Sequence, residues 1–297
     1  MSKIAKLSIL TLFLGLISFS SCQKDELEDT NLPNPDQKVT DLGKMSAFVK
    51  TGFWKAAKYS AVYSNNILKI DGVNSSNDTI RMVVAVYPNG TIYYPFYKNQ
   101  FNCGGYFNGS IDTLGYYSTR YYSDEENAGY IRFTDFDLLN NLISGNFAFR
   151  CSKEGSNSQL PITEGKFTNL KLDVDTSYKN KMAARIIPDS VNCSVTIAYD
   201  FNNNIVIDGW YSSTKRIAIM FSNQISEGDS LIIGASVSSG TASASLISGN
   251  TADNGLNGYV KITEKDSVNN VVKAVFDITT NAGTHIKNGA FDIKYFK

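Results

Sequence analysis

The sequence contains an internal repeat, which limits the folds that it can adopt. A mainly apolar run that ends in Asp-Gly occurs twice, at residues 66–72 and 203–209. A second motif begins with Gly-Tyr, continues with an aliphatic and a basic residue, and occurs at residues 129–134 and 258–263. Single positions match in the same order: Arg81 with Arg216, Asp137 with Asp266, Phe147 with Phe276 and Gly165 with Gly289. Because this order is kept while the spacing between partners drifts slowly, we predict two homologous domains that differ in the lengths of their loops.

Each repeat has the pattern of β-strands rather than helices. In segments 147–151 and 291–295 an apolar residue occupies every second position, which buries one face of a strand and leaves the other in water. Turn signals that contain glycine, such as those at Gly72 and Gly209, separate these runs. The pattern predicts an all-β fold of two tandem antiparallel domains. Each is expected to be a β-sandwich or a barrel-like sheet of about eight or nine strands, without a helix of any length.

The first residues have the pattern of a secretory signal. Lys3 and Lys6 precede an apolar run over residues 7–19, which is too short for an ordinary membrane-spanning helix. Two serines and Cys22 follow this run, and the arrangement resembles a bacterial lipoprotein signal peptide that covers residues 1–21. The resemblance implies that Cys22 is the first mature residue and carries diacylglycerol, with acyl chains of the palmitate type that anchor the protein firmly. The alternative is a plain signal peptide that is cleaved nearby.

The residues after Cys22 carry a second targeting feature. Lys24, Asp25 and Glu26 resemble the surface-export signal of lipoproteins in the Bacteroidota, in which a lysine and two acidic residues follow the lipidated cysteine. This resemblance implies a protein that is carried to the outer leaflet of the outer membrane and displayed on the cell surface. An ordinary acidic tether is the alternative, since residues 22–44 are polar, lack apolar periodicity and are predicted to be flexible.

The two domains are assigned to residues 45–173 and 181–297, with a polar connection between them. The first contains Gly-Phe-Trp-Lys-Ala at residues 52–56 and Ser-Gly-Asn-Phe-Ala-Phe at residues 144–149, in addition to the repeated segments. With these motifs, residues 45–172 resemble a domain family of unknown function that is common in lipoproteins of the Bacteroidota. The second domain lacks the tryptophan-containing opening, so its membership is inferred from the repeat. The resemblance brings no known activity and bears on fold and location only.

The composition disfavours several classes of function. Among 297 residues there is one histidine, His285, so neither a Ser-His-Asp triad nor a site with several histidines is expected. Lysine plus arginine and aspartate plus glutamate both number 28, and loss of the signal peptide with its two lysines leaves a net charge of −2. This balance gives no electrostatic reason to bind nucleic acid. No metal or cofactor is expected, because no ordered ligand spacing is present.

Cysteines and carboxylates are the remaining reactive groups. Cys103 and Cys151 lie in one repeat, and a disulfide between them is one interpretation, whereas burial of Cys151 as a small apolar side chain is the other. Asp135, Asp137 and Glu125 are the carboxylates that a glycoside hydrolase would use, although the pattern shows no cleft. Because Asp137 recurs in the second repeat after the matching strand, an Asx turn is its structural interpretation.

Tyrosine is concentrated in the first repeat. Twelve of the 17 tyrosines lie within residues 59–130, and several occur as adjacent pairs. Neighbouring residues on a strand point to opposite faces, so one tyrosine of each pair is expected to face outward. Tyr93, Tyr117 and Tyr122 are therefore candidate ligand-binding residues that would stack on sugar rings or contact a protein. The alternative is that these tyrosines cover the faces of half-buried strands.

These observations lead to an expected function. We expect a non-enzymatic binding module for a glycan or a protein, in which the first domain faces the ligand and the second is a spacer. Contact with the membrane is expected through the lipid on Cys22. A structural or accessory protein of the cell envelope is the alternative, and a carboxylate-dependent glycoside hydrolase is a further one.

Overall fold

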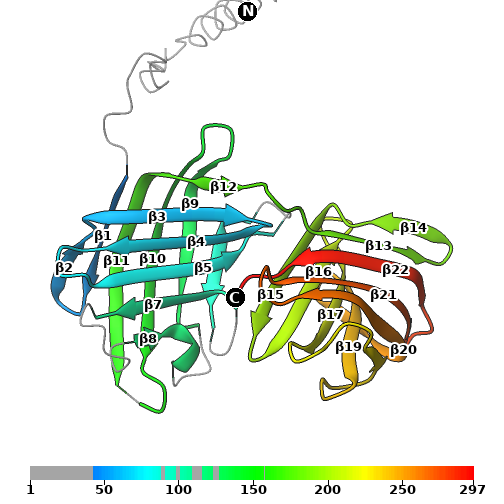
Figure 1. Ribbon diagram of the computed structural model, residues 1–297. Helices are drawn as coiled ribbons and strands as arrows, with labels where there is room; N and C mark the ends of the chain where they lie inside the picture. Colours follow the sequence, from blue (N-terminus) through cyan, green and yellow to red (C-terminus); the bar gives the residue numbers. More distant parts are fainter. Residues whose placement is uncertain (1–42, 88–90, 98–100, 109–115, 123–126, 157) are drawn as a thin grey trace, which may run out of the picture. The chain divides into compact units, whose positions relative to one another are not determined.

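The structure, a computed structural model, describes residues 43–87, 91–97, 101–108, 116–122, 127–156 and 158–297 (Figure 1). The expected lipidation and export residues lie outside these ranges, namely Cys22, Lys24, Asp25 and Glu26. Inside them the chain forms β-strands and one short turn of 3₁₀-helix, η2 (Thr119–Tyr121), which confirms the all-β prediction. No helix in the described ranges is long and apolar enough to span a membrane.

The first twelve strands form one sheet. Their bounds are β1 (Lys44–Val49), β2 (Gly52–Lys55), β3 (Lys58–Ser64), β4 (Ile67–Val73), β5 (Thr79–Ala85), β6 (Tyr93–Phe96), β7 (Cys103–Phe107), β8 (Tyr116–Ser118), β9 (Gly129–Asp137), β10 (Leu142–Ser152), β11 (Gln159–Lys171) and β12 (Asp173–Asp175). The main path is β12-β3-β4-β5-β7-β8-β10-β11-β1-β2, and β9 pairs with both β10 and β6. The sheet branches because β10 pairs with β9 over most of its length and with β8 at its last residue.

Ten further strands form the second sheet. Their bounds are β13 (Lys181–Ile186), β14 (Asp189–Asn192), β15 (Val195–Phe201), β16 (Asn204–Trp210), β17 (Lys215–Ser222), β18 (Ser230–Ile233), β19 (Thr241–Ser248), β20 (Thr251–Asp266), β21 (Val271–Thr280) and β22 (His285–Lys294). The order is β14-β13-β22-β21-β20-β18-β19-β17-β16-β15, with β19 also paired to β20. Both sheets have more strands than expected, because short strands do not show a clear period of two; examples are β8 and β12 in the first sheet and β14 and β18 in the second.

The chain between the sheets is partly a strand. β12 lies in the stretch that the sequence indicated as a polar connection, and it pairs in parallel with β3, so that Asp173 is opposite Val62. The side chain of Ser64 donates to Asp175 at 3.3 Å and ties the end of β12 to β3. Among the described strands, this pairing and that of β18 with β19 are parallel, and the other pairings follow the antiparallel prediction.

The matched glycines and phenylalanines make the same contact in both sheets. Gly165 on β11 lies opposite Phe147, and Gly289 on β22 lies opposite Phe276. A Cβ atom on Gly165 would be 2.4 Å from the ring of Phe147, and one on Gly289 would be 2.2 Å from the ring of Phe276. In each sheet the ring occupies the space that a side chain would need, so this close approach requires glycine.

Asp137 and Asp266 end equivalent strands with the same turn. The Oδ1 atom of Asp137 accepts hydrogen bonds from the backbone N–H groups of the residues two and three positions later, both at 2.9 Å. The Oδ1 atom of Asp266 accepts the two equivalent hydrogen bonds at 2.9 and 3.0 Å. In each turn an asparagine, Asn140 or Asn269, donates its side-chain N–H to the second carboxylate oxygen at 2.6 Å. These bonds confirm the predicted Asx turn and show that both aspartates have a structural role.

The structure corrects one match between the repeats. Asp71 lies opposite Arg81 in the β4–β5 pair, whereas Asp208 lies opposite Ala218 in the β16–β17 pair. Arg216 is two residues earlier on β17, so Arg81 and Arg216 are not equivalent by register. Each arginine nevertheless forms an ion pair with the equivalent aspartate. The Nε atom of Arg81 is 2.6 Å from Asp71, and the Nε atom of Arg216 is 3.0 Å from Asp208. The two domains therefore share the Asp–Arg ion pair, although the arginine occupies a different position on the strand in each.

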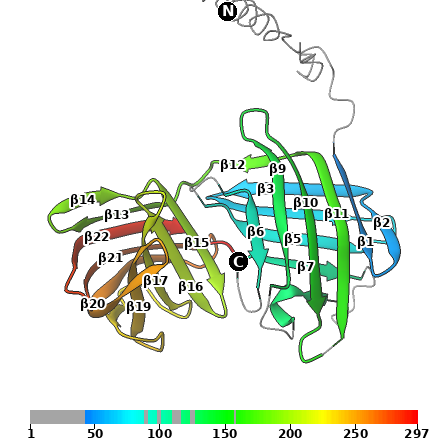
Figure 2. The ribbon, with the colours of Figure 1, turned by 180° about the vertical axis from the view of Figure 1, so that it is seen from behind.

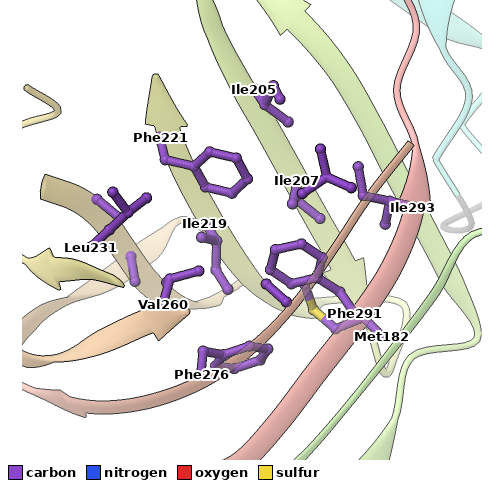
Figure 3. Packing of buried hydrophobic residues seen from close by; sticks show 14 of the residues in the cluster. Met182, Ile205, Ile207, Ile219, Phe221, Leu231, Val260, Phe276, Phe291 and Ile293 are labelled. Atoms are coloured by element: carbon purple, nitrogen blue, oxygen red, sulfur yellow. The ribbon is translucent and has the colours of Figure 1, made fainter. Parts of the chain in front are cut away.

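The strands of each sheet enclose a separate core, so the fold consists of two sandwich-like parts. The first core holds several fully buried rings, those of Tyr94, Phe96, Phe147 and Phe167. The second is mainly aliphatic and contains the rings of Phe221, Phe276 and Phe291 (Figure 3). In it, the rings of Phe221 and Phe291 are stacked with their centroids 6.1 Å apart.

A third, smaller cluster joins the two sheets. Ile67 and Val83 lie on the outer faces of β4 and β5, and they are buried together with Ile197 of β15. The ring of Phe101, just before β7, stacks on the ring of Tyr199 with centroids 4.0 Å apart and planes 23° apart. The outer face of β4, β5 and β7 is therefore partly covered by the second domain.

Candidate functional site

Strand β6 pairs with β9 (Figure 2). This pairing brings two tyrosines together on the outer face of the first sheet. On β6, Tyr94 is 1% exposed, whereas its neighbour Tyr93 is 43% exposed. For this pair, the expectation that adjacent tyrosines point to opposite faces is confirmed. Tyr93 lies opposite Arg132 of β9, and Pro95 lies opposite Tyr130. Tyr93, Tyr130 and Arg132 therefore share the outer face, and we call these three residues the tyrosine platform.

The two rings of the tyrosine platform contact each other. The centroids of Tyr93 and Tyr130 are 5.3 Å apart, and their planes differ by 27°. The residues are diagonal neighbours across an antiparallel pair, a spacing at which aromatic side chains interact. Asn127 donates its side-chain N–H to Tyr93 Oη at 3.4 Å and accepts the backbone N–H of Gly129 at 2.9 Å. Asn127 therefore links the Tyr93 ring to the beginning of β9.

Small and polar residues border the tyrosine platform on β10. Ala148 lies opposite Tyr130, and Asn146 lies opposite Arg132. The methyl group of Ala148 is too short to cover the neighbouring ring, and Arg132 is exposed. The outer face thus combines aromatic rings with a planar guanidinium that has five N–H donors. This arrangement can stack against the C–H face of a ring and donate hydrogen bonds to hydroxyl or carboxylate groups.

Two other predicted tyrosines do not join this surface. Tyr122 is 3% exposed, and Arg150 donates to its Oη atom at 3.5 Å, so the prediction of an outward Tyr122 is wrong. The reason is that η2 interrupts the strand alternation just before this residue. Tyr117 is half-buried on β8, where the Lys153 ammonium is 5.1 Å from its ring centroid and the Tyr106 ring is 6.4 Å away. β8 pairs with β7 rather than β6, which separates Tyr117 from the platform.

The described cysteines, Cys103, Cys151 and Cys193, all carry free thiols. Cys151 is fully buried and donates its S–H to the carbonyl of Leu160 at 3.5 Å, as expected for a small core side chain. Burial raises the pKa of the Cys103 and Cys151 thiols, and it raises the pKa of Cys193 to about 12. A raised thiol pKa makes the thiolate scarce at neutral pH, whereas a nucleophilic cysteine needs a lowered one.

The remaining polar candidates have structural surroundings. Glu125 lies outside the described residues, and Asp135 is exposed on β9. Donation from the Asn140 side chain and from backbone N–H groups lowers the pKa of Asp137, which keeps this carboxylate charged within its turn. His285 is exposed and bonds to a threonine hydroxyl of β21 at 3.1 Å. Within the described ranges, no three His, Cys, Asp or Glu side chains gather in a way that could hold a metal ion.

Comparison with known families assigns the domain that carries the tyrosine platform. Residues 43–171 match the family model of a domain of unknown function, DUF6252. This first domain is a DUF6252 domain. It includes strands β1 to β11 and therefore all three platform residues. No curated protein and no solved structure matches the chain.

Three residues of the site were missed by the sequence prediction. Tyr130, Arg132 and Asn127 join Tyr93 only because β6 pairs with β9, and these strands are distant in the sequence. Tyr130 did carry a usable signal, since it belongs to the repeated Gly-Tyr motif. Its counterpart in the second domain, Tyr259, is also on an outer face and is 39% exposed.

Proposed function

We propose that this protein binds a glycan through the tyrosine platform of its DUF6252 domain without changing the glycan chemically. The observation that carries the proposal is the stacked, outward-facing pair of Tyr93 and Tyr130 beside Arg132. Aromatic rings offer flat apolar faces that suit the C–H faces of sugars, and the guanidinium offers planar donors to hydroxyl groups. The raised thiol pKa values and the turn role of Asp137 support a non-enzymatic function.

We also propose that a lipid on Cys22 holds this domain on the surface of the outer membrane. The lipoprotein-type signal over residues 1–21 supports the anchor, and Lys24, Asp25 and Glu26 support export in a member of the Bacteroidota. The polar tether over residues 22–44 would separate the first domain from the lipid surface. A glycan-binding domain displayed in this way would meet polysaccharides outside the cell.

Replacement of Cys22 by alanine is expected to abolish membrane anchoring. The variant lacks the sulfur that would carry diacylglycerol, and each acyl CH₂ group withdrawn from the bilayer removes about 0.8 kcal/mol of anchoring free energy. Cells fed labelled palmitate should label the wild type and Cys193→Ala, but not Cys22→Ala, which should move to the soluble fraction. Label retained by Cys22→Ala would refute the anchor. Protease treatment of intact cells tests display, because a protein inside the cell would be protected.

Tyr93→Ala and Tyr130→Ala are each expected to weaken glycan binding at least tenfold, which corresponds to about 1.4 kcal/mol. Tyr259→Ala is the matched control. Tyr259 occupies the same register position in the β20–β21 pair as Tyr130 does in the β9–β10 pair. Retardation in native gels that contain mannan, xylan, arabinogalactan or pullulan measures the binding, after a glycan array has selected the polymer. Equal retardation of the wild type and both platform variants would contradict the proposal.

A protein-binding role in the envelope is the second candidate. It is favoured by exposed apolar residues on the outer face of the second domain, where Ile232 lies opposite Tyr259 and is 66% exposed. This function predicts co-purification with other envelope proteins and no retardation by any polysaccharide. Ile232→Ser should then release the co-purified proteins, whereas Tyr93→Ala should not.

A further inference from the structure

The second domain contains a cavity of about 310 Å³ at one end of its sheet. It lies between the segment that follows β17 and the segment that joins β18 to β19. Ile225 and Leu231 contribute two buried aliphatic side chains, which are 7% and 3% exposed. The polar lining includes Gln224, Asp229, Ser230 and Ser239. Six of the nine lining residues carry polar side chains, so hydrogen bonds would dominate the recognition of a ligand there.

Hydrogen bonds hold the walls of this cavity in place. Lys265 of β20 donates through Nζ to the carbonyl of Asn223 and, at 2.7 Å, to that of Ile225, so it fixes the segment on both sides of Gln224. Asp229 accepts the backbone N–H of Ser226 through Oδ2 at 2.7 Å. On the other wall, Ser238 donates its backbone N–H to Thr241 Oγ1 at 2.8 Å. The cavity is therefore formed before any ligand arrives, which lowers the entropic cost of binding.

Several polar groups of the lining remain available to a ligand. In the described part of the chain, no hydrogen bond engages Asp229 Oδ1, the side-chain amide of Gln224 or the hydroxyl groups of Ser230 and Ser239. None of the side chains that line the cavity is cationic, and Asp229 contributes a negative charge. The ammonium of Lys265, which bonds to the wall, attracts the Asp229 carboxylate, so the charges near the cavity balance and suit a neutral ligand. A carboxylate and an amide that line the same cavity can accept and donate hydrogen bonds with two adjacent hydroxyl groups.

We propose that this cavity binds a single neutral sugar residue through a vicinal diol. Asp229 and Gln224 would take the adjacent hydroxyl groups, and Ile225 and Leu231 would contact the C–H face of the ring. The volume is near the lower limit of about 300 Å³ for small-molecule sites, which suits one sugar ring rather than a chain. The site lies in the second domain and stands independently of the tyrosine platform. It gives that domain a binding role in place of the expected spacer role.

The register of the two sheets relates this cavity to the first domain. Leu231 lies opposite Val260 in the β18–β20 pair, as Tyr94 lies opposite Ile131 in the β6–β9 pair. Ser230 consequently holds the position of Tyr93. A large aromatic side chain in the first domain thus corresponds to a small hydroxyl at the edge of the cavity. The two domains expose different recognition chemistry on equivalent strands.

Nuclear magnetic resonance titration of the soluble chain from residue 23 onward tests this proposal. Glucose, galactose, mannose and N-acetylglucosamine are added separately, and hexane-1,6-diol, which has no vicinal diol, is the control compound. At least one sugar should give saturable shifts at the amides of Ser230 and Ser239. Asp229→Ala should weaken this binding at least tenfold, and Ser239→Trp should abolish it by filling the cavity. Asp189→Ala, which removes an exposed carboxylate of β14, should leave it unchanged.

Three results would overturn the proposal. The first is the absence of saturable shifts with all four sugars, and the second is an equal response to hexane-1,6-diol. The third is binding that survives Ser239→Trp, since that exposed position tolerates a large side chain without disturbing the core. Shifts confined to the amides of Tyr93, Tyr130 and Arg132 would support the tyrosine platform and refute the cavity, so the two proposals fail separately.

Discussion

Gly165→Ala is expected to destabilise the first domain by about 3 kcal/mol, the upper end of the usual cost of overpacking. The new methyl carbon would lie 2.4 Å from ring atoms of Phe147 and 2.5 Å from its backbone carbonyl oxygen. The ring cannot retreat easily, because it packs against Phe149 and Phe167 with centroids 6.1 and 6.4 Å away. Gly289→Ala should destabilise the second domain similarly, since its Cβ would lie 2.2 Å from the Phe276 ring.

Chemical denaturation of the variants measures this effect. Gly52→Ala is the matched control on β2, where the nearest atom would be 3.6 Å from the added carbon, and its effect should stay within about 0.5 kcal/mol. Trp54 lies in the core of the first domain and reports on that domain, whereas Trp210 of the second domain also contacts Tyr87 of the first, with ring centroids 5.5 Å apart. Adding Phe147→Leu to Gly165→Ala should restore part of the lost stability, because the smaller leucine side chain leaves room for the methyl group at residue 165. Equal stability of Gly165→Ala and Gly52→Ala would refute this packing argument.

Features that depend on local pattern were predictable from the sequence. The period of two correctly placed Phe147, Phe149 and Cys151 on a buried face. The recurrence of Asp137 correctly indicated an Asx turn, because such a turn is formed by residues that are close in sequence. The repeat also predicts that Gly165 and Gly289 are equivalent, and their contacts with Phe147 and Phe276 agree. In each case the physical cause lies within a few residues or within the repeat itself.

Features that depend on long-range pairing were not predictable. The tyrosine platform requires β6 to pair with β9, and nothing local to Tyr93 indicates Tyr130 as its neighbour. The adjacent pair Tyr121 and Tyr122 predicts an outward Tyr122 only if both lie on a strand, whereas η2 turns the chain there. β12 was too short to show any period and paired with the distant β3. The predicted equivalence of Arg81 and Arg216 is wrong, because two residues of the same charge can occupy different register positions on equivalent strands.

Arg216→Met is expected to destabilise the second domain by about 3 kcal/mol at neutral pH, because it leaves a buried carboxylate without its counter-charge. Asp208 is 6% exposed, and its Oδ1 atom is 3.0 Å from Arg216 Nε in an ion pair that is not aligned as a hydrogen bond. The guanidinium also lies over the Trp210 ring, 4.7 Å from its centroid. Methionine keeps most of the aliphatic stem, so the loss should come mainly from the charge.

Arg81→Met in the first domain is the matched control. Its partner Asp71 is closer to solvent, with 15% of its side chain exposed, and it has a second cation in Lys69, whose Nζ atom is 3.2 Å away. Arg81 itself is 38% exposed, so water screens the pair. The expected loss is below about 1 kcal/mol, the usual range for surface ion pairs. A similar loss in both variants would mean that burial of Asp208 is not the cause.

The pH dependence separates lost charge pairing from lost packing. Burial raises the pKa of Asp208, and the charge of Arg216 opposes that rise, so the pKa should increase further in Arg216→Met. A raised carboxyl pKa means that the folded state holds a proton that the unfolded state has released. Stability is then lost as pH rises from the ordinary aspartate value of about 3.9 through the raised folded value. The deficit of Arg216→Met relative to the wild type should therefore shrink as pH falls toward 4, in urea titrations at several pH values. A deficit that is constant with pH would assign the loss to the contact with Trp210 instead.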